Sequence, residues 1–185
     1  GCTLIAALNV RLSSPMPGVI RVDAVHHKGQ NKRAPEFEIE TSDVCVSIEE
    51  TENAYLYTSG NLTCRVDKTP GHWGLEFISD GQRLTGTTDR SLAWMHDKST
   101  GKAYMTEQLF LDVGENIYGL GERFGPFVKN GQVVEMWQGD GGSCSELAYK
   151  NVPLYLSNRG YGVFVNNPGD VAFEIASEDV EKGEI

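Results

Sequence analysis

The sequence has few residues of the kinds that build membrane spans or contacts to nucleic acids. No apolar run in its 185 residues approaches the roughly 20 residues of a membrane-spanning helix, so we expect a soluble protein without a membrane partner. Basic residues are outnumbered, with 16 Lys and Arg against 26 Asp and Glu and a formal charge of −10. This balance argues against nucleic acids and anionic membranes as partners, and it suits a neutral ligand such as a sugar.

Cysteine and histidine are also sparse, with four of each. The cysteines form no CxxC pair and have no histidine at ligand spacing, so we expect no metal site and no cofactor. Cys45 and Cys64 fall within strand-like runs, where a buried free thiol is the simpler interpretation. His26 and His27 have no third ligand nearby, and we assign residues 24–35 to an exposed polar loop. No histidine lies in the Gly-rich stretch described below, so a Ser-His-Asp site is unsupported.

No apolar pattern with a period of 3.6 residues lasts for three turns, so a long helix is not expected. The chain instead holds short runs of alternating apolar and polar residues, with turns at intervals of about ten residues, a spacing typical of an all-β sandwich. Asp80-Gly81 and Asn158-Arg159-Gly160 are the clearest turns. We therefore predict one antiparallel β-sandwich domain over residues 1–185. The predicted strands are 19–25, 44–49, 54–58, 62–67, 73–78, 103–111, 152–157, 161–166 and 171–175.

Both ends of the chain look cut. It begins with Gly1 rather than Met, shows no basic-then-apolar leader, and ends on Glu184-Ile185 without a terminating feature, so we expect it to be part of a longer protein. Asn61-Leu62-Thr63 matches the acceptor motif for N-glycosylation, a match that carries weight only in a secreted protein.

The stretch 116–167 holds the candidate site. Two predicted strands end it, and before them lies a polar, Gly-rich segment, 119–151, which we read as one long loop. Loops of that length inside a compact domain are usually functional. Its Gly119-x-Gly121-x-x-x-Gly125 pattern misses the dinucleotide-binding spacing by one residue, and no helix follows it, so we reject a dinucleotide site.

Four carboxylates remain in this segment: Glu122, Glu135, Asp140 and Glu146. A glycosidase needs two carboxyl groups that face one bond, about 5 Å apart for retention or farther for inversion. Four acids in one segment fit that requirement. The alternative is structural, with Glu122 paired to Arg123 or a neighbour and the other glutamates solvated.

Asp140 differs from the other acids because it lies within Trp137-Gln138-Gly139-Asp140-Gly141-Gly142. An aromatic ring beside a carboxylate on a glycine-rich bend offers a face and a hydrogen-bond acceptor to a sugar. An aspartate that only makes the turn with its glycines is an equal alternative. Trp137 is a candidate for either a stacking platform or an anchor of the loop.

Five motifs within about fifty residues resemble, in one order, the amino-terminal domain of glycoside hydrolase family 31, and most closely its α-xylosidase branch. They are Tyr118-Gly119-Leu120-Gly121-Glu122-Arg123-Phe124, Asn130-Gly131-Gln132, Trp137 with Asp140-Gly141-Gly142, Ala148-Tyr149-Lys150-Asn151-Val152-Pro153, and Asn158-Arg159-Gly160-Tyr161-Gly162-Val163. The first 115 residues match only by their β-rich character and their position upstream.

The resemblance implies a galactose-mutarotase-like β-sandwich that precedes a (β/α)₈ barrel. In the family the barrel supplies an Asp nucleophile and an Asp general acid/base, and hydrolysis retains configuration. A barrel needs about 250 residues, so the catalytic pair is expected outside this chain and no residue here is expected to be catalytic. A sandwich loop of the family lends an Asp to the leaving-group side of the pocket, and the matching residue here is Asp140, preceded by an atypical Gln138-Gly139.

The function implied is therefore the non-catalytic part of a retaining α-glycosidase. Its oligosaccharide substrate would carry terminal α-xylosides of the xyloglucan type, or alternatively α-glucosides. The barrel would be its partner, and the full enzyme is expected to form an oligomer. Two other classes stay open: a free-standing carbohydrate-binding sandwich, and a structural module that covers the barrel with Phe124, Phe127 and Trp137. The tyrosines 118, 149, 155 and 161, with Phe124, are expected in the core and at interfaces.

Overall fold

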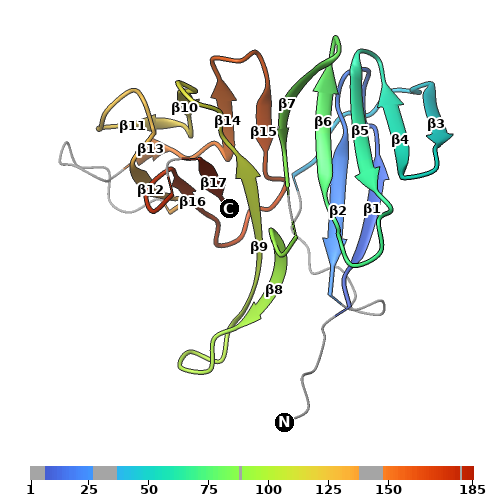
Figure 1. The fold of residues 1–185 in the computed structure, drawn as a ribbon. Coiled ribbons are helices and arrows are strands. Elements are labelled where there is room, and N and C mark those ends of the chain that lie inside the picture. Colours follow the sequence, from blue (N-terminus) through green and yellow to red (C-terminus); the bar gives the residue numbers. More distant parts are fainter. Residues whose placement is uncertain (1–6, 27–36, 88, 138–147, 180) are drawn as a thin grey trace. The chain divides into compact units, whose positions relative to one another are not determined.

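The computed structural model describes residues 7–26, 37–87, 89–137, 148–179 and 181–185. Within these ranges the chain forms strands β1 to β17 and no helix, and neighbouring strands pair antiparallel (Figure 1). The predicted all-β antiparallel class is confirmed for this part of the chain. None of its described segments is a helix of the length and apolarity that a membrane crossing requires.

The chain divides into two compact units, which are described separately. Unit 1 comprises Gly1–Arg33 and Ile39–Glu107, and unit 2 comprises Ala34–Glu38 and Gln108–Ile185. Strand β9 (Ala103–Phe110) begins in unit 1 and ends in unit 2.

Unit 1 is built on a meander of five strands that pair in sequence order (Figure 1). Separate from this sheet, β1 pairs with β2, and β8 pairs with the first half of β9. The strands of the meander are β3 (Val46–Glu50), β4 (Ala54–Ser59), β5 (Leu62–Asp67), β6 (Leu75–Ser79) and β7 (Gln82–Gly86). The others are β1 (Asn9–Ser13), β2 (Arg21–Val25) and β8 (Leu92–His96).

The turns of the meander are made by residues that tolerate a positive φ. Asp80 and Gly81 both have positive φ, 51° and 75°, as the two central residues of a type I′ hairpin turn require. Gly60, between β4 and β5, has a φ of 58°. The predicted Asp80-Gly81 turn is therefore confirmed, since β6 and β7 pair on either side of it.

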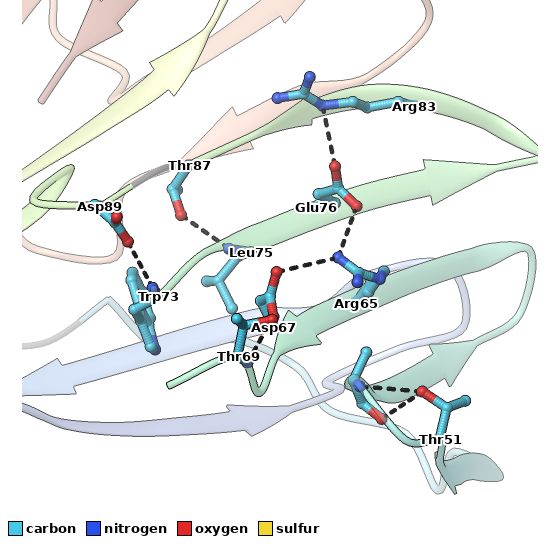
Figure 2. A network of polar contacts seen from close by, with 11 residues as sticks. Thr51, Arg65, Asp67, Thr69, Trp73, Leu75, Glu76, Arg83, Thr87 and Asp89 are labelled. Carbon is cyan, nitrogen blue, oxygen red and sulfur yellow. Dashed lines mark hydrogen bonds and ion pairs between the residues drawn. The ribbon is translucent and has the colours of Figure 1, made fainter. Parts of the chain in front are cut away.

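The two faces of the meander differ in polarity, as strand alternation predicts. One face holds Cys64, which is fully buried, and Leu75. On the other face Glu76 accepts a hydrogen bond from Arg65 at 3.2 Å and lies 3.9 Å from the Arg83 guanidinium (Figure 2). These cross-strand ion pairs tie β5, β6 and β7 together on the polar face.

Backbone groups at the start of β6 are satisfied by side chains that follow β7. Thr87 Oγ1 accepts a hydrogen bond from the Leu75 amide at 2.9 Å, and Asp89 Oδ1 accepts one from the Trp73 amide at 2.6 Å (Figure 2). The bond from the Trp73 amide is the main cause that lowers the pKa of the Asp89 carboxyl. Together the two bonds tie the start of β6 to the residues that follow β7.

Unit 2 consists of shorter strands. β10 (Ile117–Gly119), β14 (Leu154–Ser157) and β15 (Gly162–Phe164) form one sheet, and β11 (Glu122–Arg123) pairs with β13 (Ala148–Lys150). β12 (Gln132–Glu135), β16 (Ala172–Ile175), β17 (Lys182–Glu184) and the end of β9 form another. Their shared core is a cluster of buried residues: Leu111, Ile117, Leu120, Val134, Tyr155, Phe173 and Ile175.

Several details of the sequence prediction were wrong. The segment 119–151 is not one loop, because β11, β12 and β13 lie within it. The strand at 171–175 is not the last, since β17 follows it, and β1 was not predicted.

The cysteine and histidine predictions were partly wrong. Cys45 is exposed and precedes β3, whereas Cys64 is buried as predicted, and burial raises the pKa of its thiol to about 12. The predicted loop at 24–35 begins too early, because β2 runs to Val25. His26 stacks on Trp94 with ring centroids 4.1 Å apart, while His27 lies outside the described residues.

Candidate substrate-side site

Trp137 is the last described residue before the segment 138–147. It follows β12, and its indole is 70% exposed. Asp140 and Glu146 lie outside the described residues, so their predicted roles stay predictions. Of the other two candidate acids, Glu122 is exposed on β11 and Glu135 is exposed at the end of β12.

Arg123 connects the described residues on both sides of Trp137 and the segment 138–147. Its Nε donates to the carbonyl oxygen of Leu120 at 3.0 Å, and its Nη2 donates to the carbonyl oxygen of Glu135 at 2.5 Å. The same Nη2 donates to Oδ1 of Asn151. Burial lowers the pKa of this guanidinium. The alternative that Glu122 pairs with Arg123 is wrong, since the acceptors of Arg123 among the described residues are these three oxygens.

The glycines of the rejected dinucleotide pattern have a structural reason. Gly119, Leu120 and Gly121 all have positive φ, at 104°, 63° and 94°. A Cβ on Gly121 would stand 2.0 Å from the Lys150 carbonyl oxygen, and one on Gly119 would stand 2.7 Å from the Leu154 carbonyl oxygen. Only glycine permits this approach of two backbones. The turn between β10 and β11 therefore lies directly against the backbone of 150–154.

Leu120 sits between these glycines and is fully buried in the core of unit 2. A non-glycine residue rarely adopts positive φ without compensation. Here the compensation is the burial of its side chain, and its amide also donates to the carbonyl oxygen of Leu154 at 2.9 Å.

Exposed aromatic rings surround the same elements. Phe124 and Tyr149 pack edge to face with centroids 5.3 Å apart, and both are more than two fifths exposed. Phe127, which is 79% exposed, packs on Tyr118 at 5.2 Å. By contrast, Tyr155 is a core residue. Such exposed rings are typical of surfaces that contact another molecule or domain.

The remaining motifs act as structural joints. Asn130 Oδ1 accepts from the Ile117 amide at 2.9 Å, and Asn158 Oδ1 accepts from the Asn116 amide at 3.1 Å. Arg159 forms an ion pair with Asp112. The two asparagines thus satisfy backbone amides that the short strands leave without a ladder partner.

Sequence reasoning missed Glu115, which is 96% buried. Its Oε1 accepts hydrogen bonds from Ser157 Oγ and from the Tyr161 hydroxyl, each at 2.5 Å, and its Oε2 accepts one from the Asp112 amide at 2.8 Å. No local pattern marks Glu115, because its two side-chain partners are 42 and 46 residues away.

The described residues of this region carry exposed aromatic rings and side chains that bind backbone oxygens. Among them no three His, Cys, Asp or Glu side chains gather in a way that could hold a metal ion. The region therefore presents the exposed side chain of Trp137, the exposed rings of Phe124, Tyr149 and Phe127, and an arginine that binds the backbone oxygens of Leu120 and Glu135.

Comparison with known proteins agrees with this geometry. The model of the glycosyl hydrolase 31 N-terminal galactose mutarotase-like domain matches residues 9–174, across both units. The chain is 42% identical to an alpha-xylosidase of Emericella nidulans and 43% identical to an alpha-xylosidase of Lactiplantibacillus pentosus, in each case over 94% of its own length. It spans only 25% and 22% of these two relatives.

Solved structures share the fold. A glycoside hydrolase family 31 dextranase of Flavobacterium johnsoniae superposes with a TM-score of 0.79 at 20% identity, covering 96% of this chain and 24% of the dextranase. A family 31 alpha-xylosidase from a soil metagenome gives 0.76 at 17% identity, covering 97% and 28%. The predicted galactose-mutarotase-like sandwich and the resemblance to family 31 are both confirmed. The chain belongs to the glycosyl hydrolase 31 N-terminal galactose mutarotase-like domain family.

Proposed function

We propose that this chain is the amino-terminal, non-catalytic part of a retaining α-glycosidase and that the segment 138–147 contributes to the leaving-group side of its active site. Support comes from the identity of more than 40% to two alpha-xylosidases, each of which the chain spans by about a quarter. The catalytic acids then belong to the barrel of the longer enzyme, which is the partner of this domain.

The proposed substrates are oligosaccharides with terminal α-xylosides, as in xyloglucan fragments. The names of the two relatives favour xylosides, and α-glucosides are the alternative. A neutral sugar also suits the chain's formal charge of −10, since a neutral ligand meets no long-range repulsion.

In this proposal Asp140 is ionised and accepts hydrogen bonds from sugar hydroxyls. Each such charged contact contributes about 1.5–3 kcal/mol when it is sheltered from water. The observation that carries the role is the exposure of Trp137, three residues earlier, which leaves a flat apolar face free for stacking on a sugar. These groups bind and orient the leaving group, whereas bond cleavage falls to the barrel.

Kinetics of the full-length enzyme test this role. With a disaccharide that links α-xylose to glucose, Asp140→Ala should raise KM and lower kcat/KM by about tenfold to a hundredfold, the equivalent of one charged hydrogen bond. The circular dichroism spectrum should not change. Wild-type kinetics in this variant would remove Asp140 from the site.

A second role, contact with the barrel, is favoured by the exposed rings of Phe127 and Phe124. Large exposed aromatic side chains in one region are typical of interfaces. Hydrogen exchange of the full-length enzyme should show that the backbone around these residues is protected, whereas fast exchange there would exclude them from an interface.

A further inference from the structure

We propose that Arg123 and Lys129 together bind an acidic side chain of the barrel, at the surface where the rings of Phe124 and Phe127 are exposed. Such a contact rests on the proposed function, in which the barrel of a longer enzyme is the partner of this domain. It adds the chemistry of that contact: two cations of unit 2 bind one carboxylate of the partner.

Lys129 carries its charge in a buried position without an acid beside it. The residue is only 5% exposed, and among the described residues its ammonium group has a single hydrogen-bond partner, the carbonyl oxygen of Pro126 at 2.8 Å. An ammonium group has three protons to donate, and a lysine is rarely buried to this extent unless an acid pairs with it. The described part of the chain supplies a neutral oxygen in place of that acid.

The guanidinium of Arg123 also has only neutral partners in the described ranges. Its Nε and Nη2 donate to the carbonyl oxygens of Leu120 and Glu135 and to the amide oxygen of Asn151. Its third nitrogen, Nη1, has no acceptor among the residues that the structure describes. The two N–H donors of Nη1 are therefore available to a further group, and a planar guanidinium suits a carboxylate better than any other.

The two cations are close enough to affect each other. Burial lowers the pKa of Lys129, and the positive charge of Arg123 lowers it further. Two like charges with neutral neighbours disfavour each other's charged form, whereas a carboxylate bound to both would offset their repulsion and pair the buried ammonium group. An anionic group is therefore what these two side chains would bind most strongly.

The residues around the two cations favour a protein partner over a dissolved ion. Pro126, whose carbonyl oxygen binds Lys129, is exposed, so the ammonium group lies just below the surface. On either side of it Phe124 and Phe127 are 41% and 79% exposed. Exposed rings next to a charged group are typical of interfaces between proteins or domains. The chain spans only 25% and 22% of its two alpha-xylosidase relatives, so a longer enzyme has ample surface to supply the acid.

Cross-linking of the full-length enzyme with a carbodiimide tests the contact directly, because this reagent joins a lysine amine to a carboxylate that touches it. Mass spectrometry of the digested enzyme should find Lys129 linked to an Asp or Glu that lies beyond residue 185. The proposal is overturned if Lys129 forms no link, or if it is linked to an acid within residues 1–185. A link between isotope-labelled and unlabelled copies of the enzyme would show that a second copy supplies the acid, and this would overturn it too.

Lys129→Met in the full-length enzyme tests the same contact by the sign of its effect. If a carboxylate pairs with Lys129, the variant leaves that carboxylate buried without one of its partners, and thermal inactivation at a fixed temperature should be about tenfold faster or more. The carbonyl of the exposed Pro126 can bind water instead. If Lys129 is an unpaired buried charge, its removal should leave the inactivation rate unchanged or lower it, which would contradict the proposal. Lys150→Met, the same change at an exposed lysine of β13, is the control and should have no effect.

Inorganic phosphate distinguishes a carboxylate of the barrel from a dissolved anion. With a carboxylate bound, phosphate should shift the Tm of the wild type and of Lys129→Met equally. A stabilisation by phosphate that Lys129→Met abolishes would assign the two cations to a free anion and would overturn the proposal. None of these measurements uses activity. A full-length enzyme that fails to cleave α-xylosides would therefore refute the proposed function, while the cross-link and the Lys129→Met variant would still decide what Arg123 and Lys129 bind.

Discussion

The meander of unit 1 and the short strands of unit 2 reach a stable β-structure by different means. In unit 1, β3 to β7 are five or six residues long and pair in sequence order. In unit 2, β10, β11, β13, β15 and β17 have only two or three residues each. Few ladder hydrogen bonds form between such short strands, and side chains such as Arg123 and Asn130 bind the backbone in their place. Unit 2 should therefore depend on single residues more strongly than unit 1.

The largest effect is expected at Gly121. An alanine there would place its Cβ 2.0 Å from the Lys150 carbonyl oxygen and would have to adopt a φ of 94°. Left-handed backbone alone costs about 1–2 kcal/mol and overpacking about 1–3 kcal/mol more. Gly121→Ala should thus destabilise unit 2 by about 2–5 kcal/mol in urea denaturation, with faster hydrogen exchange in β10 to β15 than in β3 to β7.

Gly131 is the matched control for Gly121. It has a φ of 80° but no atom within 4 Å of an added Cβ, so Gly131→Ala should show only the backbone cost of about 1–2 kcal/mol. Equal losses at the two glycines would show that the close approach of the backbones is not the source of the strain.

An effect of the next size is expected at Glu107, the last residue of unit 1. Its Oε1 is buried without a hydrogen-bond partner among the described residues, and burial raises the pKa of the carboxyl from 4.5 to about 7. Between these values the folded chain keeps a proton that the unfolded chain has released. Stability from this group is therefore present below about pH 4.5 and is lost as the pH rises toward 7.

Glu107→Gln removes this titration. As the pH rises from 4.5 to 8, the free energy of unfolding of the variant should increase relative to that of the wild type by on the order of 2–3 kcal/mol. Parallel curves of stability against pH for the two proteins would contradict the assignment. Such a gain would show that unit 1, too, contains one residue, Glu107, whose burial changes the free energy of unfolding as much as a core contact does.

A moderate effect is expected at Thr87, which is 95% buried. Thr87→Val keeps the shape of the side chain but leaves the Leu75 amide without its acceptor, at a cost of about 1–3 kcal/mol. Thr58→Val is the control, because Thr58 bonds another hydroxyl, that of Thr63, and is only half-buried. If Thr87→Val lowers the free energy of unfolding by less than about 0.5 kcal/mol, which is about the error of such a measurement, the Leu75 amide must be reached by water.

The smallest effect is expected at Ile48 on the edge strand β3. Its side chain is 70% exposed, so Ile48→Ala should change stability by no more than about 0.5 kcal/mol. Ile175 is fully buried in unit 2, so Ile175→Ala should lower the free energy of unfolding by about 2–5 kcal/mol. A large loss at Ile48 would reveal that another part of the protein covers β3.

The same contrast explains how much of the molecule could be predicted from its sequence. Strands such as β5 and β6 follow from local alternation, and the Asp80-Gly81 turn follows from the backbone freedom of two residues. The hydrogen bond from Arg123 to Asn151 joins residues that are 28 positions apart, and no local sequence pattern predicts it. β17 was missed for a related reason: its Lys-Gly-Glu sequence has no apolar alternation, and pairing with β9 and β16 defines it.

The candidate site divides in the same way. Its motifs led to the correct family because they are specific as a set, yet their individual roles were not evident. Asn130 and Arg159 turned out to be joints of the scaffold, while Arg123, first considered as a partner for Glu122, holds backbone oxygens instead.

The bridge at Arg123 also defines where one loop could be exchanged for another. Because a single guanidinium binds both Glu135 and Asn151, we expect these two residues to keep their separation when the residues between them are exchanged. If the proposed function holds, exchange of the residues between these junctions for those of a relative should change the leaving-group preference of the full-length enzyme. Such a chimaera must keep the Gly-Leu-Gly-Glu-Arg motif, because this motif supplies the arginine that binds both junctions.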